Sequence, residues 1–382
     1  MIKRVLVFVI DGFGIGPLPD AADYGDADAH TLVHLADAVG GLSLPNLEAL
    51  GLGHLAKISG VASMAQPHGS FGRLGFTSKG KDSVSGYWET NGITAPESAA
   101  AYQAGIPESV VTVIEQALGR KLIGHRVASM GSMLREYGAE HLSSGAPILW
   151  TDGGNTCYVA AHEAVMPVAA LHQQCREAWR EARKIGRLIR MVAQPVTGEP
   201  SALRPQNGRK DFVAEPPGLT MLDVLSRSSQ ITMGIGKVYD LFSGRGLTKA
   251  FPAASAFDDT VGMMNKVPRG LLYVSLDLLS ENSVQAADAL QEFDRRLPNL
   301  FEQLRAGDMV IVTGDHGRDL SKPDQLPTRE YVPVLVTGPK LAQGVNLGTR
   351  QTAADLGQTI VDALGADRLS IGDSFWEALR PG

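Results

Sequence analysis

The stretch MVIVTGDHG, residues 309–317, combines a strand pattern with two metal-binding side chains. Residues 309–313 are apolar or β-branched, which predicts a strand buried inside a sheet. The run then passes through Gly314 to Asp315 and His316. A carboxylate and an imidazole at the carboxyl end of a buried strand are better suited to binding a metal ion than to packing in an apolar core. A solvated Asp–His pair is the alternative, so other parts of the chain must supply further ligands.

Two other stretches repeat the pattern of a strand that ends in an acid. Residues 5–10 are continuously apolar and run into Asp11, and residues 271–276 run into Asp277. Sites in open α/β sheets form at the carboxyl ends of the strands, so Asp11 could meet the Asp315–His316 pair. The glycines that follow Asp11 do not have the dinucleotide-binding spacing, which excludes that class of site.

A third candidate is Ser83, within the run SKGKDSVSGYWETNG of residues 78–92. Small, polar and glycine residues surround it, and Lys81 and Asp82 precede it. A helix that begins here would offer free N–H groups and its positive dipole end to an oxyanion. The stretch suits a hydroxyl nucleophile that becomes phosphorylated and is activated by a metal, because no His lies nearby in the sequence. A Gly/Ser surface loop is the alternative.

Residues 26–51 have a helical pattern with a turn at 44–46, which places His30 and His34 one helical turn apart. Such a pair could hold a metal. More often one His of such a pair faces solvent while the other packs against the fold or caps the helix.

The middle of the chain has a different pattern of predicted helices and strands from the two ends. Between 98 and 214, helical patterns at 108–118 and 167–185 alternate with strand patterns, listed here: 147–151, 157–161 and 188–193. Residues 198–217 are rich in Pro, Gly and Arg and predict a long loop. Its Arg204, Arg209 and Lys210 could hold an anionic substrate or could simply be solvated.

The α/β alternation resumes after Pro217. It predicts strands at 230–235 and 332–337, a helix at 285–304 and a closing helix from about 353. The predicted organisation is therefore a core of residues 1–97 and 215–382, with an inserted cap domain of residues 98–214.

Composition limits the classes of function. The chain has 382 residues and a net charge of -6, so nothing suggests a nucleic-acid partner. It has no apolar run of membrane-spanning length, and its first residues lack a signal-peptide cleavage site. Cys157 and Cys175 are its only cysteines, which suits a reducing cytoplasm.

Several longer runs resemble phosphopentomutases, a family of the alkaline phosphatase superfamily. They are VIDGFGIG (9–16), SKGKDSVSGYWE (78–89), GAPILWT (145–151), FVAEPP (212–217), GIGKVYDLFSGRGLTK (234–249), FDRRLP (293–298), VTGDHG (312–317) and TREYVPVLVTGP (328–339). The resemblance implies an α/β fold with a mostly parallel sheet flanked by helices, plus a smaller inserted α/β cap. It also implies two Mn²⁺ ions and phosphoryl transfer within a sugar phosphate through a phosphorylated hydroxyl.

The resemblance assigns the first metal site to Asp11, Asp315, His316 and the nucleophile oxygen. The nucleophile position holds Ser83, where the family has Thr. All the ligands of this site are present.

The second metal site is altered, which marks the chain as a divergent member. The resemblance assigns this site to Asp277 and two His residues, but Asn282 and Pro327 stand at the His positions. Glu281 and Asp324 lie nearby in the sequence and could replace them. The sequence therefore predicts one Mn²⁺ site with a complete ligand set and a second site without one.

The resemblance also implies substrate-binding residues, listed here: Lys81, Asp152, Arg209, Lys210 and Lys237. Of these positions, Arg209 and Lys237 match the family pattern. The run at 150–155 and the residue at 210 depart from it, so the natural substrate cannot be read from the sequence.

The predicted activity is that of a phosphomutase, an isomerase that moves a phosphoryl group within a sugar phosphate through a phosphoserine. One alternative is a single-metal phosphatase or phosphotransferase of the same superfamily. Another is a degenerate paralogue that binds a metabolite or partner without turnover. Nothing in the sequence indicates the oligomeric state.

Overall fold

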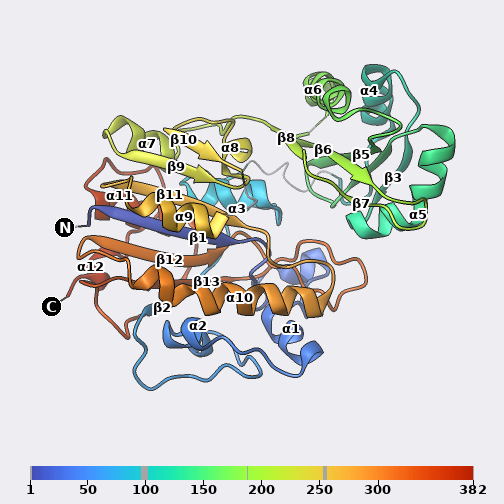
Figure 1. Ribbon diagram of the computed structural model, residues 1–382. Coiled ribbons are helices and arrows are strands. Elements are labelled where there is room, and N and C mark those ends of the chain that lie inside the picture. The colour runs from blue at the N-terminus through green and yellow to red at the C-terminus, as the bar shows by residue number, and fades with distance from the viewer. Residues whose placement is uncertain (1, 96–101, 187, 253–255, 382) are drawn as a thin grey trace. The chain divides into compact units, whose positions relative to one another are not determined.

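The computed structural model describes residues 2–95, 102–186, 188–252 and 256–381 (Figure 1). The chain forms two compact units, Met1–Ala95 with Pro216–Gly382, and Pro96–Glu215. The predicted first domain boundary, between residues 97 and 98, lies outside the described residues. No helix in the described ranges is both long enough and apolar enough to cross a membrane.

The first unit is built on a mixed sheet with a parallel centre. Across the described residues its eight strands run in the spatial order β10 (Lys249–Phe251), β9 (Ile231–Ile235), β11 (Gly270–Leu276), β1 (Arg4–Ile10), β12 (Asp308–Gly314), β13 (Val332–Thr337), β2 (Ser70–Leu74) and β14 (Asn346–Arg350). Strands β10, β9, β11, β1 and β12 are mutually parallel, whereas β13 runs antiparallel to both β12 and β2. The predicted α/β fold with a mostly parallel sheet is confirmed.

Helices cover this sheet. They are α1 (Thr31–Val39), α2 (Pro45–Ala49), α3 (Ser83–Thr90), α7 (Met221–Arg227), α8 (Val238–Leu241), α9 (Ala256–Met264), α10 (Ser283–Phe301), α11 (Ala354–Leu364) and α12 (Trp376–Leu379). Helix α10 packs against α1 and α2 on one side of the sheet, and α11 packs against α7 and α3 (Figure 1).

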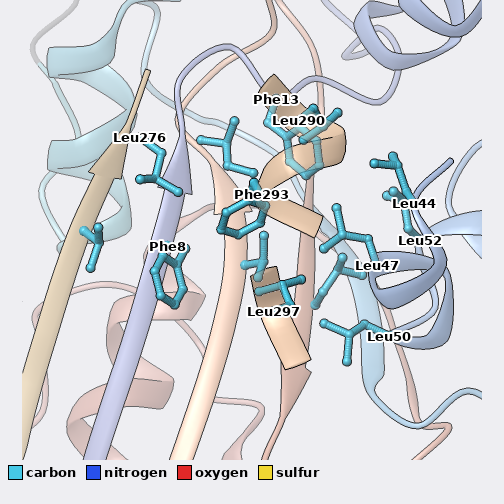
Figure 2. Close-up of a cluster of buried hydrophobic side chains, with 14 of the residues drawn as sticks. Phe8, Phe13, Leu44, Leu47, Leu50, Leu52, Leu276, Leu290, Phe293 and Leu297 are labelled. Carbon is cyan, nitrogen blue, oxygen red and sulfur yellow. The ribbon is translucent and has the colours of Figure 1, made fainter. Parts of the chain in front are cut away.

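Alternating side chains of β1 show why these strands are buried. Leu6, Phe8 and Ile10 enter the cluster beneath α10, where the rings of Phe8 and Phe293 meet edge to face with centroids 5.8 Å apart. Figure 2 shows Phe8 facing α10, with leucines from around α2 beyond that helix. An apolar run with both faces covered is typical of a parallel strand.

The second unit has its own sheet and two apolar clusters. In the described residues its strands are β3 (Ile123–Val127), β4 (Ile148–Thr151), β5 (Thr156–His162), β6 (Arg190–Thr197), β7 (Arg204–Pro205) and β8 (Lys210–Val213). Its helices are α4 (Glu108–Leu118), α5 (Met130–Ser144) and α6 (Val168–Ile185). One cluster includes apolar residues of α4 and α6, and the other includes residues of α5.

Two details of the predicted secondary structure are wrong. The helical span predicted at 26–51 is interrupted, because Gly40 ends α1 in a left-handed conformation and α2 begins only at Pro45. The loop predicted at 198–217 contains β7 and β8, which both pair with β6. Short strands at a sheet edge tolerate Pro. The Pro-rich composition of this segment therefore predicted a loop where the structure has two short strands.

Candidate active site

Strand register places three acids at one edge of the first unit's sheet. Ile10 pairs with both Leu276 and Gly314, so Asp11, Asp277 and Asp315 all follow the ends of neighbouring strands. Only two of the three converge. Asp11, Asp315 and His316 place ligand atoms within 4.8 Å of one another, and they form the one such group of three found in the described residues. Asp277 is exposed and lies outside the group.

Asp315 is the most enclosed member of this group, at 1% exposure. Its Oδ1 accepts from the backbone N–H of Gly12 at 3.1 Å, whereas its Oδ2 is buried without a hydrogen-bond partner. Burial favours the neutral acid, but the charges of His316 and Lys237 and the bond from Gly12 outweigh it and lower the pKa of Asp315. A buried, ionised carboxylate oxygen that accepts no hydrogen bond fits a bound cation.

The ring of His316 is oriented by the backbone. Its Nδ1 lies 2.8 Å from the carbonyl oxygen of Gly317. A carbonyl can only accept, so Nδ1 carries a proton, and in the neutral ring Nε2 then has the lone pair. That Nε2 lies 3.6 Å from Asp11 Oδ1 and 3.5 Å from Asp315 Oδ2. The carbonyl therefore holds the imidazole in the tautomer that a metal ligand needs.

Ser83 is the first residue of α3 and is brought to the same group. Asp82 caps the helix by accepting from the N–H of Ser85 at 3.0 Å. The Oγ of Ser83 lies 3.3 Å from Asp11 Oδ2 and 3.4 Å from His316 Nε2. The hydroxyl therefore faces the candidate metal ligands and sits at the positive end of a helix.

Lys237 lies in contact with the candidate metal ligands and with Ser83. It follows β9, and its Nζ donates to Ser83 Oγ at 3.0 Å, pairs with Asp11 and lies 3.6 Å from Asp315 Oδ2. Its ammonium also stands 5.6 Å from the centre of the Tyr87 ring. The sequence suggested a substrate-binding role for Lys237 but did not predict its contacts with both carboxylates and the hydroxyl.

A further carboxylate, that of Glu330, connects the loops around the candidate site through hydrogen bonds. It is 1% exposed and accepts from the N–H groups of Gly16 and Thr31 at 2.9 and 3.0 Å. It also accepts from the hydroxyls of Thr31 and Thr328, each at 2.6 Å. Burial outweighs these four hydrogen bonds and raises the pKa of Glu330.

Glycines in the two loops that carry the candidate metal ligands make room for Glu330. A Cβ at Gly14 or at Gly317 would stand 2.4 Å from its carboxylate oxygens. Glu330 belongs to the run TREYVP, but the sequence of that run did not predict that Glu330 would hold the neighbouring loops in place.

Other predicted site residues in the first unit lie elsewhere. Lys81 pairs with Asp26 at 2.7 Å. His30 precedes α1, and His34 Nδ1 lies 2.6 Å from Asp319 Oδ2. The His pair therefore does not form a three-ligand group with described residues.

In the second unit, two predicted substrate-binding residues, Asp152 and Arg209, make polar contacts at the ends of β4 and β8. Asp152 accepts from the hydroxyl of Tyr158 at 2.7 Å. Asp211 pairs with both Arg190 and Arg209, the latter at 2.9 Å. Lys210, next to Asp211, is half-buried in β8. The guanidinium of Arg209 is therefore held in place by a buried acid.

Comparison with known proteins identifies the family. Residues 280–368 match the family model of the Metalloenzyme superfamily. The chain is 39% identical to a phosphopentomutase from Carboxydothermus hydrogenoformans, covering 99% of this chain and 100% of the relative. It is 38% identical to a phosphopentomutase from Herpetosiphon aurantiacus, with coverage of 99% and 100%.

A solved structure of the PH0037 protein from Pyrococcus horikoshii has a TM-score of 0.50 and 11% identity, covering 97% of this chain and 99% of that chain. At that identity the likeness concerns the fold alone. The near-complete matches to curated relatives decide the family. The chain belongs to the phosphopentomutase family, and it is a metal-dependent phosphomutase of the isomerase class.

Proposed function

We propose that this protein moves a phosphoryl group between two hydroxyls of a pentose phosphate, with Ser83 carrying the group in transit. The observation that carries the proposal is the position of Ser83 Oγ, which lies 3.0 Å from Lys237 Nζ and 3.3 Å from Asp11 Oδ2. The nucleophile, a fixed cation and a candidate metal ligand thus meet at one oxygen. The phosphorylated sugars on which the relatives act make a pentose phosphate the substrate to test first.

Asp11, Asp315 and His316 would hold one divalent ion, which we propose to be Mn²⁺. Their donor set fits such an ion because it combines two carboxylates, one with an oxygen that accepts no hydrogen bond, and a correctly oriented imidazole. When bound, the ion lowers the pKa of the serine hydroxyl and offsets phosphoryl charge.

The chain's own residues contribute the remaining electrostatics. Lys237 holds the two acids together against their mutual repulsion and donates to the Ser83 oxygen. The N-terminus of α3 favours the negative charge of a phosphoserine. Transfer breaks the bond between phosphorus and the Ser83 oxygen and forms a bond from phosphorus to a sugar hydroxyl. Return of the other phosphoryl group of the resulting bisphosphate restores the phosphoserine.

We further propose that residues 1–97 and 215–382 form the catalytic core and residues 98–214 a substrate-binding cap. Arg209 and Lys210 supply positive charge in that domain, Asp152 supplies a hydrogen-bond acceptor, and Lys81 adds charge in the core. The buried Asp211 orients the Arg209 guanidinium, which suits it to bind a phosphate with two parallel hydrogen bonds.

A phosphorus NMR time course tests the function. Purified protein with Mn²⁺ and a trace of bisphosphate primer is given ribose 5-phosphate and, separately, ribose 1-phosphate. Interconversion of the two esters is the expected result, and it should disappear in Ser83→Ala. Release of inorganic phosphate without interconversion would instead identify a single-metal phosphatase.

A further inference from the structure

The residues that should form a second metal site do not fit an ion. Asn282 uses its side chain to cap α10, accepting from the N–H of Gln285 at 3.1 Å. Pro327 has no ligating side-chain atom, and Asp277 is exposed. Asp324 is exposed as well, and Glu281 lies 3.7 Å from the guanidinium of Arg318. These donors do not form a three-ligand group in the part of the chain that the structure describes.

Arg318 joins the two segments that would have carried those ligands. Its Nη1 donates to the carbonyl of Leu279 at 3.0 Å, in the segment that follows β11. Its Nε donates to the carbonyl of Gln325 at 3.2 Å, in the segment that precedes Pro327. A guanidinium has five N–H donors, so these two bonds leave donors for another acceptor. A positive charge therefore stands between the two segments, with the Glu281 carboxylate 3.7 Å away.

The sheet order shows where this charge lies relative to the catalytic residues. Arg318 follows β12 and reaches a carbonyl beyond β11, and these two strands lie on either side of β1. Its side chain therefore extends from the loop after β12 toward the loop after β11. A Cβ built on Gly12 would lie 2.7 Å from the Cβ of Arg318, so the stem of the arginine rests on the residue next to Asp11.

We infer that Arg318 takes the place of the second metal ion, so that the enzyme uses one ion per chain and binds a phosphoryl oxygen of its substrate through this guanidinium. The inference builds on the proposed phosphomutase activity. Arginine keeps its charge at any working pH, and its planar fork matches phosphate geometry. Its two carbonyl contacts fix the fork before substrate arrives, which reduces the entropy lost on binding.

Metal stoichiometry tests the first half of the inference without measuring activity. Equilibrium dialysis of the wild-type protein against Mn²⁺ alone should give one ion per chain, and Asp315→Asn should remove it. Glu281→Gln and Asp324→Asn should leave the value at one. Two ions per chain in the wild-type protein, or loss of an ion in Glu281→Gln or Asp324→Asn, would overturn the inference.

Substitution of Arg318 tests the second half. Arg318→Ala should lower kcat/KM for ribose 5-phosphate by about 100-fold or more, while Mn²⁺ stoichiometry stays at one. Free guanidinium ion should restore part of that rate, whereas urea and sodium chloride at the same concentration should not. Arg318→Lys, which keeps the charge but loses the fork, should fall between Arg318→Ala and the wild type and keeps the test valid if Arg318→Ala folds poorly.

Gln325→Asn provides the matched control. It shortens the side chain that donates to the carbonyl of Glu281 at 3.2 Å, and Asn tolerates the left-handed backbone at this position, where φ is 49°. Its activity should stay near that of the wild type. Wild-type kcat/KM in Arg318→Ala, or a loss that guanidinium does not relieve, would refute the phosphate contact. If the wild-type protein interconverts no ester, the proposed function fails, but dialysis still decides the number of ions.

Discussion

Gly86 of α3 lies against the backbone of Asp315 so closely that a Cβ at position 86 would stand 2.0 Å from the Asp315 carbonyl oxygen. The helix that begins with Ser83, the proposed nucleophile, thus packs directly on Asp315, a proposed metal ligand. Gly86→Ala should cost about 1–3 kcal/mol of unfolding free energy, because backbone atoms cannot move aside as a flexible side chain can. Urea unfolding measures the change.

Gly262 of α9 is the control for this substitution. A Cβ there would meet nothing within 4 Å, so Gly262→Ala should stabilise the protein by about 0.5–1 kcal/mol through helix propensity alone. Equal effects of the two substitutions would contradict the packing argument.

Ser83→Ala should abolish the phosphorylated protein and lower kcat by at least about 1,000-fold, because no other described hydroxyl holds these contacts with Asp11 and Lys237. Intact-mass measurement after incubation with a bisphosphate detects the modification. Ser83→Thr keeps the alcohol and should remain within about tenfold of the wild type. A phosphoprotein that survives Ser83→Ala would rule out this nucleophile.

Asp315→Asn should weaken Mn²⁺ binding by at least about 100-fold, since it removes a buried anionic ligand. Asp277→Asn removes an acid from the same sheet edge but outside the group, so it should change the affinity by about threefold or less. Isothermal titration with Mn²⁺ compares the two variants. Similar losses in both would show that Asp277 is a ligand after all.

Asp211→Asn should destabilise the second unit by about 3–5 kcal/mol, because it leaves the buried Arg190 without its partner. Guanidinium-chloride unfolding, followed by a probe within residues 102–186 or 188–215, measures the loss. Glu181→Gln breaks an exposed pair with Lys184 on α6 and should cost about 0.5 kcal/mol or less. If Asp211→Asn is no worse than Glu181→Gln, the buried pair does not stabilise the fold.

The same carboxyl group should make stability depend on pH. Burial alone would raise the pKa of Asp211, but Arg190 and Arg209 outweigh it and lower the pKa below its ordinary value of 3.8. Since the folded-state pKa is the lower one, the stabilisation is complete above about pH 3.8 and is lost as the pH falls through the folded-state value. The difference in unfolding free energy between wild type and Asp211→Asn should therefore shrink in acid. A difference that stays constant down to about pH 2 would contradict this assignment.

The central strands were predictable because their signal is local. Apolar runs that end in an acid at Asp11, Asp277 and Asp315 indicated both the strands and the functional edge of the sheet. Which acids converge was not predictable, since the direction of a side chain beyond a strand depends on the loop that follows. Asp277 accordingly follows an apolar run in the sequence as Asp11 and Asp315 do, yet it lies outside their group.

The contacts of Lys237, Glu330 and Arg318 could not be predicted for a different reason. Each depends on which strands become neighbours, and a single sequence does not state that order. Lys237 meets Asp11 across 226 positions because β9 and β1 both flank β11. Asn282 and Pro327 predicted an incomplete second metal site, but they did not predict the contacts that Arg318 makes with the carbonyls of Leu279 and Gln325.

The proposed replacement of a metal ion by Arg318 has a consequence for how the enzyme would depend on its surroundings. A charge built into the polypeptide cannot dissociate, be chelated or be exchanged for a competing ion. The protein would then have to bind only one ion from its surroundings, the one at Asp11, Asp315 and His316. An enzyme of this design would need one bound ion where a two-metal enzyme needs two, so its activity would fall less steeply as the metal concentration falls.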